Sequence, residues 1–264
     1  MSAYRQTLVE FFTSFYGGEA TSAGSGDTNA YQAEYEATPH KLTVELSDDV
    51  EVRKELLFPD GSAYVLHNLL TPAECAAIQQ QATEMGLRDS GYSSRIRVCE
   101  RVSAMGHALA AALFERARPH LGGNIEVGAE RGDREPGVPP SLEEGVYEPY
   151  GLNPCFRIVR YAPGGFFFPH FDGGFERSAS NTSIKTFMMY LNEGFEGGPT
   201  NFYKESQQHY KQPDPANVIH SYRPRAGSCL VFNHRITHDG GELISGEKWL
   251  FRSEVMYKLR EKMG

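Results

Sequence analysis

Short apolar runs separated by Gly, Pro and Asn residues fill the second half of the chain. Their lengths and the turn residues between them are typical of β-strands. Many short strands in succession predict a sandwich or barrel rather than alternating βαβ units. The expected strands are 61–70, 155–161, 166–172, 184–192, 200–203, 228–233 and 248–257.

Two segments ahead of the later strands are expected to be helical. In 71–86, Thr71 suits the N-cap position, Glu74 completes a capping box and Gly86 suits the end of a helix. The segment 101–121 predicts a second helix. Two helices followed by many strands make an α+β fold in which the helices brace one face of a jelly roll.

The pattern predicts one folded domain preceded by a leader. Much of 1–40 is rich in Gly, Ser, Thr and Asn, a composition typical of flexible segments. We therefore expect a flexible leader at 1–40 and a single domain at 41–264. Within that domain we expect helical support at 41–121, a loop at 122–154 and the jelly roll at 155–260.

Composition and charge narrow the possible partners. Hydrophobic residues make up 40% of the chain and charged residues 23%, which is ordinary for a globular protein. The net charge is −8. Because nucleic-acid affinity depends on neutralising phosphates, this charge disfavours nucleic acid and anionic membrane as partners.

The cysteines and the N-terminus indicate a reducing, intracellular setting. The four cysteines are scattered without a C-x-x-C pair, so we expect buried free thiols. The first residues lack the basic region and apolar core of a secretory signal. No run approaches the ~18 apolar residues of a membrane helix. We therefore expect a cytoplasmic protein.

The stretch "FFFPHFD" at 166–172 places two polar side chains at the end of an apolar run. On a strand, His170 and Asp172 point to the same face and form a pair of potential metal ligands. A third ligand is available downstream, where His234 and His238 both follow a buried-looking strand. Two histidines and one carboxylate leave coordination positions open, which suits non-haem Fe(II). A structural zinc site would close with four ligands, typically including Cys.

A second feature is a pair of cations beyond these histidines. Lys248 and Arg252 share one face of the last strand with Leu250. A cation that points into a barrel is costly unless an anion meets it. A dicarboxylate cosubstrate would supply that anion, and Arg would bind it in a bidentate fork.

Together these segments resemble the catalytic core of the iron(II)- and 2-oxoglutarate-dependent dioxygenases, nearest to the prolyl 4-hydroxylase-like branch. The similarity extends over 155–257, and "LLTPAECAAI" resembles the helix that precedes this core in many members. The matching segments, in the order the family has them, are "RYAPGGFFFPHFD", "TFMMYLNEGFEGGPTNFY", "PRAGSCLVFNH" and "THDGGELISGEKWLFRSEVMY". The resemblance implies a double-stranded β-helix core.

Carried onto this chain, the resemblance makes His170, Asp172 and His238 the iron ligands, and His234 the disfavoured candidate. An aspartate in this motif favours hydroxylation, because a halogenating relative has a small residue at that position.

The resemblance also implies a set of contacts for 2-oxoglutarate. The prolyl hydroxylase pattern assigns the far carboxylate to Lys248, whereas other branches place an arginine further along the strand, at Arg252. We favour Arg252, because its fork suits a carboxylate. Tyr161, Tyr190 and Thr200 are further candidates for the cosubstrate pocket, and each tyrosine is equally compatible with an aromatic core.

The implied activity is hydroxylation of an unactivated C–H bond, with decarboxylation of 2-oxoglutarate to succinate. It requires Fe(II), 2-oxoglutarate and O2, with ascorbate as a further candidate requirement. Prolyl 4-hydroxylase similarity suggests a peptidyl proline, covered by loops at 173–183 and 204–224. A free amino acid or another small metabolite is the alternative, and a non-catalytic metal-binding jelly-roll protein is the lesser one. Oligomeric state has no signal in the sequence.

Overall fold

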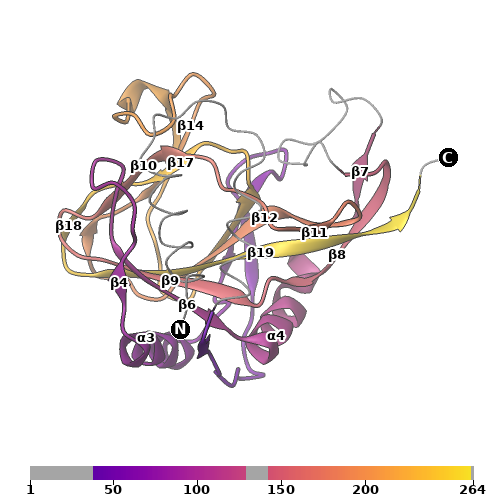
Figure 1. The fold of residues 1–264 in the computed structure, drawn as a ribbon, viewed down its shortest axis with the longest axis horizontal. Coiled ribbons are helices and arrows are strands. Elements are labelled where there is room, and N and C mark those ends of the chain that lie inside the picture. The colour runs from indigo at the N-terminus through magenta and orange to yellow at the C-terminus, as the bar shows by residue number, and fades with distance from the viewer. Residues whose placement is uncertain (1–37, 129–141, 263–264) are drawn as a thin grey trace, which may run out of the picture.

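The computed structural model describes residues 38–128 and 142–262 (Figure 1). Most of the predicted leader at 1–40, and part of the predicted loop at 122–154, therefore lie outside the described residues. The domain boundaries remain predictions. Among the described residues, no helix is long and apolar enough to cross a membrane.

Most strands of the described residues belong to one large, mainly antiparallel sheet. Its central path is β1 (His40–Lys41), β6 (Glu100–Met105), β9 (Cys155–Tyr161), β19 (Lys248–Glu261), β12 (Asn181–Tyr190), β16 (Cys229–Asn233), β3 (Ala63–His67) and β2 (Arg53–Leu56). Four further strands pair beside this path: β4 (Arg88–Asp89), β7 (Ile125–Val127), β8 (Gly145–Leu152) and β11 (Glu176–Ser178).

A smaller sheet lies opposite and completes the jelly roll. Its strands, in order, are β15 (Val218–Tyr222), β14 (Thr200–Tyr203), β17 (His238–Gly240), β10 (Phe166–His170) and β5 (Arg97–Val98). A separate pair joins β13 (Glu196–Gly197) to β18 (Leu243–Ser245). This arrangement confirms the predicted double-stranded β-helix of an α+β protein.

The two faces of the large sheet have different roles. On β19, Leu250 belongs to the apolar cluster between the two sheets, whereas Trp249 and Phe251 belong to the cluster on the other face. That second cluster includes α3 (Pro72–Met85) and α4 (His107–Ala117), so helices cover the outer face, as predicted (Figure 1). Short 3₁₀ turns occur at η1 (Arg118–His120) and η3 (Pro215–Asn217).

Helix α3 confirms the predicted capping box. The side chain of Thr71 accepts from the backbone N–H of Glu74, and the Glu74 carboxylate accepts from the backbone N–H of Thr71. The four cysteines are also buried free thiols, as expected.

Two sequence predictions were wrong in part. The helix expected over 101–121 begins only at His107, because the residues before it form β6, where burial alternates as in a strand. The expected loop 122–154 contains β8, which pairs along the C-terminal half of β19. Both segments are strands because they pair with distant strands, and such pairing cannot be read from the composition of either segment.

The candidate ligands lie on and beside two neighbouring strands of the smaller sheet. Strand β10 pairs with β17 in a register that sets His170 opposite His238. The register between Phe167 and His170 is irregular, and β10 ends at His170 rather than continuing to 172. Asp172 is therefore held by the chain that follows the strand, through its backbone N–H to the carbonyl of His234 (2.9 Å).

Candidate functional site

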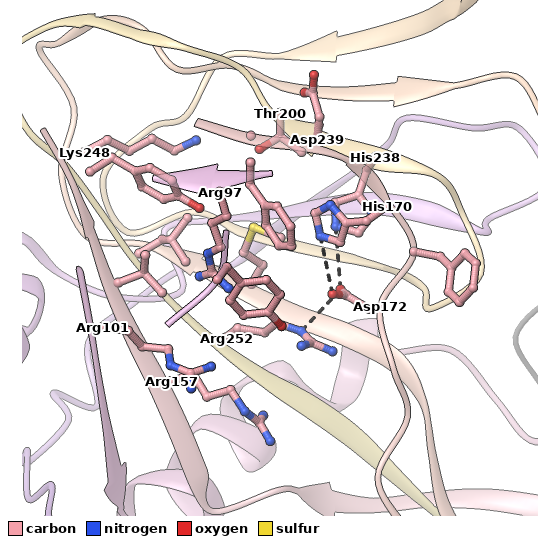
Figure 2. A pocket seen from close by; sticks show the side chains of 18 of the residues that line it. Arg97, Arg101, Arg157, His170, Asp172, Thr200, His238, Asp239, Lys248 and Arg252 are labelled. Carbon is pink, nitrogen blue, oxygen red and sulfur yellow. Dashed lines mark ion pairs between the residues drawn. The ribbon is translucent and has the colours of Figure 1, made fainter. Parts of the chain in front are cut away.

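A buried cluster of two histidines and one carboxylate faces the pocket between the sheets (Figure 2). His170, Asp172 and His238 each offer one ligand atom, and these atoms lie within 4.8 Å of one another. Nε2 of His170 lies 3.9 Å from Oδ1 of Asp172, and Nε2 of His238 lies 3.7 Å from Oδ2. The structure thus brings together the three residues that the motif singled out.

Backbone carbonyls orient both histidine rings. Nδ1 of His170 lies 2.7 Å from the carbonyl oxygen of Phe168, and Nδ1 of His238 lies 2.9 Å from that of Ile236. Because a carbonyl only accepts, each Nδ1 carries a proton, and the neutral tautomer with this hydrogen bond keeps its lone pair on Nε2. Burial lowers the pKa of His170 well below its usual value. Two such nitrogens facing a carboxylate fit a divalent transition metal.

Asp172 is held as a carboxylate by its neighbours. Its Oδ2 accepts a hydrogen bond from the hydroxyl of Thr186 (2.5 Å) and lies 3.2 Å from Nε of Arg252. Burial alone would raise the pKa of Asp172, but the charge of Arg252 and the hydrogen bond from Thr186 hold it below the usual range. The group is therefore ionised at neutral pH, and Oδ1 is its less engaged oxygen.

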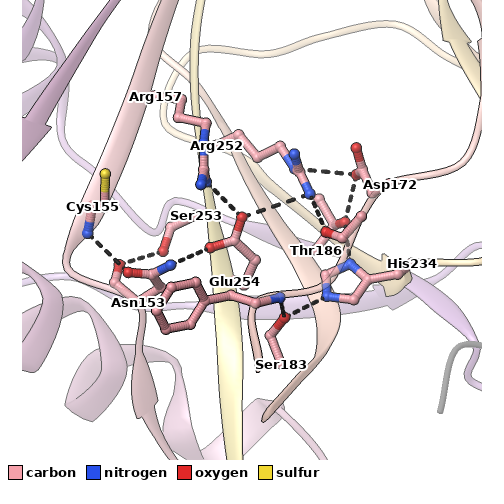
Figure 3. Close-up of polar contacts among 12 residues, drawn as sticks. Asn153, Cys155, Arg157, Asp172, Ser183, Thr186, His234, Arg252, Ser253 and Glu254 are labelled. Atoms are coloured by element: carbon pink, nitrogen blue, oxygen red, sulfur yellow. Dashed lines mark hydrogen bonds and ion pairs between the residues drawn. The ribbon is translucent and has the colours of Figure 1, made fainter. Parts of the chain in front are cut away.

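His234 lies behind this carboxylate and supports it. Because the Thr186 proton goes to Asp172, Nδ1–H of His234 donates to the Thr186 oxygen (2.9 Å). Nε2 of His234 then accepts from the hydroxyl of Ser183 (2.9 Å), which itself accepts from the backbone N–H of Phe175 (2.7 Å). Burial lowers the pKa of His234 to about 3, so the ring is neutral. The donors form one chain directed at Asp172 (Figure 3).

Arg252 sits between two carboxylates in this network (Figure 3). Besides Asp172, its guanidinium approaches Oε1 of Glu254 at 3.6 Å. Glu254 is fully buried, and it also accepts from Arg157 (2.7 Å) and from the side-chain amide of Asn153 (2.8 Å). The charge of Arg252 is therefore already matched within the protein.

Lys248 is in a different position. Its buried Nζ donates to the carbonyl of Gly198 (2.7 Å) and lies 5.4 and 5.7 Å from the ring centres of Tyr161 and Tyr190. Gly198 has φ +61, and a Cβ there would lie 3.2 Å from Cδ of Lys248. Within 38–128 and 142–262, Lys248 forms no ion pair. Burial lowers the pKa of this ammonium to about 8, and the nearby carboxylate of Asp239 offsets only part of that shift.

The remaining predicted residues lie around Lys248. Tyr161 and Thr200 line the pocket, whereas Tyr190 stands behind it and shares a 2.7 Å hydrogen bond with the hydroxyl of Thr200. Burial raises the pKa of both tyrosines, so both hydroxyls stay protonated. They are available as hydrogen-bond donors, not as bases.

Several pocket residues had no signal in the sequence analysis. Arg97 and Arg157 come from β5 and β9 and line the same pocket. Asp239 also lines it and accepts from the hydroxyl of Tyr203 (2.6 Å). Of these three, only Asp239, beside His238, lay close enough to a motif to be found from the sequence.

Comparison with known proteins agrees with the motifs. Residues 156–253 match the model of the 2OG-Fe(II) oxygenase superfamily. Prolyl 4-hydroxylase 1 of Arabidopsis thaliana is 22% identical over 218 residues, which cover 75% of this chain and 70% of that protein.

Two solved structures are also similar. A viral collagen prolyl hydroxylase of Paramecium Bursaria Chlorella virus-1, solved as a 2OG complex, has a TM-score of 0.47 and 18% identity, covering 76% of this chain and 98% of its own. A Pseudomonas putida prolyl-4-hydroxylase has a TM-score of 0.47 and 17% identity, covering 75% of this chain and 93% of its own.

Proposed function

Since this chain is a 2-oxoglutarate- and Fe(II)-dependent dioxygenase of the prolyl 4-hydroxylase-like kind, we propose that it hydroxylates an unactivated C–H bond and converts 2-oxoglutarate to succinate and CO2. The observation that carries this proposal is the buried triad of His170, Asp172 and His238, which opens onto the same pocket as Lys248.

The triad would hold the iron through Nε2 of His170, Nε2 of His238 and Oδ1 of Asp172. The donor set fits, because both imidazole lone pairs converge on a carboxylate that its surroundings keep ionised. Three protein ligands leave positions for the cosubstrate and O2. Bound iron supplies the activation of O2 and the oxidative decarboxylation. The protein residues position the reactants and exclude water.

We propose Lys248, rather than Arg252, as the anchor for the far carboxylate of 2-oxoglutarate. Arg252 already pairs with Asp172 and Glu254, whereas Lys248 is a buried ammonium that forms no ion pair with a carboxylate of the described residues, with Asp239 acting on it only at longer range. A cosubstrate carboxylate there would offset the cost of burying the charge. The hydroxyls of Thr200 and Tyr161 lie in the same pocket and would complete the carboxylate site.

Aromatic side chains would keep water away from the reacting atoms. The ring of Phe167 stacks on His170, with ring centres 3.6 Å apart. Phe171 and Tyr92 also line the pocket. A dry wall on this side protects a reactive centre from side reactions.

Two substrate classes are compatible with this chemistry. The named relatives suggest a peptidyl proline. A free amino acid or other small metabolite is the second candidate, and a specific observation favours it: the pocket contains the buried guanidinium of Arg97, which forms no ion pair with a carboxylate of the described residues.

The proposed function is tested by measuring succinate formation from 2-oxoglutarate with a peptide library and with a metabolite extract. Products are searched by mass spectrometry for the gain of one oxygen atom. We expect succinate that requires Fe(II) and O2, and none from His238→Gln. No succinate with either pool, together with no iron bound by the anaerobic protein, would overturn the proposal.

A further inference from the structure

Arg97 is a buried cation in the pocket wall that the proposed chemistry does not use. It is 9% exposed, and its guanidinium stacks over Phe167 at 4.6 Å and over Tyr92 at 5.2 Å. Its Nε donates to the thiol sulfur of Cys99 (2.9 Å). The hydroxyl of Tyr161 is a further polar neighbour. Aromatic faces and a thiol support a guanidinium only weakly compared with a carboxylate.

Three other pocket cations already have an anionic partner, either in the protein or in the proposed cosubstrate. Arg157 pairs with Glu254, Arg252 pairs with Asp172, and Lys248 is assigned to the cosubstrate. For Arg97, by contrast, no ion pair with a carboxylate occurs anywhere in the described parts of the chain. Burying an arginine charge is costly unless an anion meets it.

The charge of the whole pocket supports the same conclusion. Asp172 and Asp239 are the carboxylates among the residues that line it, and the cations are Arg97, Arg101, Arg157, Lys248 and Arg252. The buried Glu254 behind the pocket pairs with Arg157 and Arg252 and balances one of these charges. A divalent metal and a dianionic cosubstrate cancel each other, so the loaded pocket stays positive although the chain carries −8. Figure 2 shows the four guanidinium groups gathered on one side of the pocket.

The position of Arg97 relative to the triad indicates the size of the ligand. Strand β5 pairs with β10 so that Arg97 lies opposite Phe167. The same Phe167 ring stacks on His170, with ring centres 3.6 Å apart. The Phe167 ring therefore contacts both the Arg97 guanidinium and the imidazole of a candidate metal ligand. An anion held by Arg97 would place the neighbouring carbons of a small molecule near the metal.

We propose that Arg97 binds an anionic group of the substrate, so that the substrate is a small molecule with a free carboxylate, of the amino-acid type, rather than a proline inside a peptide. This inference rests on the proposed function, because it assigns the substrate of the same site. A free carboxylate matches the guanidinium in charge and geometry. The backbone amide of an internal peptide residue carries no such charge.

The test compares acids with their neutral amides. The anaerobic protein, loaded with Fe(II) and 2-oxoglutarate, is titrated calorimetrically with the common L-amino acids and with their primary amides. The same compounds are then assayed in air for succinate formation. We expect at least one acid to bind about tenfold or more tightly than its amide, and to stimulate succinate formation where the amide does not.

Variants assign that preference to Arg97. Arg97→Gln should abolish the difference between acid and amide while leaving the affinity for 2-oxoglutarate unchanged, and Arg97→Lys should keep part of it. The matched control is Arg160→Gln, because Arg160 pairs with Glu100 outside the pocket lining. The melting temperature of each variant, measured without added ligand, shows whether it is folded.

Three results overturn the inference. Equal binding of acids and amides, or binding of neither, would show that the site does not select an anionic substrate. An acid preference that survives at full strength in folded Arg97→Gln assigns it to another residue. A weaker affinity of Arg97→Gln for 2-oxoglutarate would make Arg97 a cosubstrate contact. Failure of the proposed function is distinct, because it appears as absent iron binding and absent succinate in the wild-type protein.

Discussion

The hydroxyl of Thr186 lies 2.5 Å from Oδ2 of Asp172 and donates to it, while its oxygen accepts from Nδ1 of His234. Thr186 is fully buried on β12, in the opposite sheet from His170 and His238. This hydrogen bond therefore fixes Asp172, which follows β10 of the smaller sheet, against β12 of the larger sheet. Groups that orient a metal ligand in this way raise metal affinity without touching the metal.

Thr186→Val is expected to weaken metal binding about tenfold to a hundredfold, because it removes the hydrogen bond and keeps the shape of the side chain. Isothermal titration with Fe(II) under anaerobic conditions measures the effect. Thr182→Val is the matched control, since Thr182 is equally buried on the same strand but donates to backbone carbonyls. Equal losses in the two variants would contradict a specific role for Thr186.

Variants at His234 and His238 should differ in the amount of iron that they bind. His238→Gln is expected to lose stoichiometric iron and all measurable succinate formation. His234→Gln is expected to keep one iron per chain at reduced affinity, because His234 contacts Ser183 and Thr186 instead of facing the pocket. Metal analysis of both purified proteins checks this. Loss of iron in His234→Gln, with retention in His238→Gln, would reverse the assignment.

Much of the fold was predictable because local pattern and tertiary role agree. The runs at 155–161 and 200–203 coincide with β9 and β14, since each is bounded by turn residues. The segment 101–106 was misassigned because its identity as a strand depends on pairing with β9, far along the chain. Pairing partners of this kind leave no mark in local composition.

The site was predictable where chemistry is concentrated in a motif and not where it is assembled from distant strands. His170, Asp172 and His238 follow a known spacing, and Lys248 and Arg252 alternate correctly on one strand. The sequence did not show that Arg252 meets Glu254 two residues away on the same face. Nor did it show Arg97, because the two-residue strand β5 that carries it has no periodicity.

The two cations of β19 should therefore have different phenotypes. Lys248→Met is expected to raise the dissociation constant of 2-oxoglutarate by about a hundredfold or more, because it removes the charge partner of the far carboxylate. Arg252→Gln is expected to act mainly on iron affinity, through Asp172. Calorimetric titration with 2-oxoglutarate and, separately, with Fe(II) distinguishes them. The sequence-based preference for Arg252 would be restored if only Arg252→Gln lost cosubstrate affinity.

The affinity for 2-oxoglutarate should fall at alkaline pH. Burial lowers the pKa of Lys248 to about 8, so above that pH the free site has lost the proton that binding requires. Affinity should be flat below about pH 8 and then decrease by up to tenfold per pH unit, until the higher pKa of the complex is reached. The control is a 2-oxo monoacid without the far carboxylate, whose binding should not show this step. An unchanged 2-oxoglutarate affinity between pH 7 and 10 would rule out the protonated Lys248 as its anchor.

Glu254 should contribute strongly to stability, because it neutralises two buried arginines. It is fully buried, lies 2.7 Å from Arg157 and 3.6 Å from Arg252, and also accepts from Asn153. Removing one partner of a buried ion pair leaves an uncompensated charge and costs about 3–5 kcal/mol. Glu254→Ala is expected to lose that much free energy of unfolding in urea, and Glu148→Ala, which breaks a half-exposed pair with Lys258, about 1 kcal/mol or less. Similar losses in the two variants would show that the guanidinium groups are stabilised by something other than Glu254.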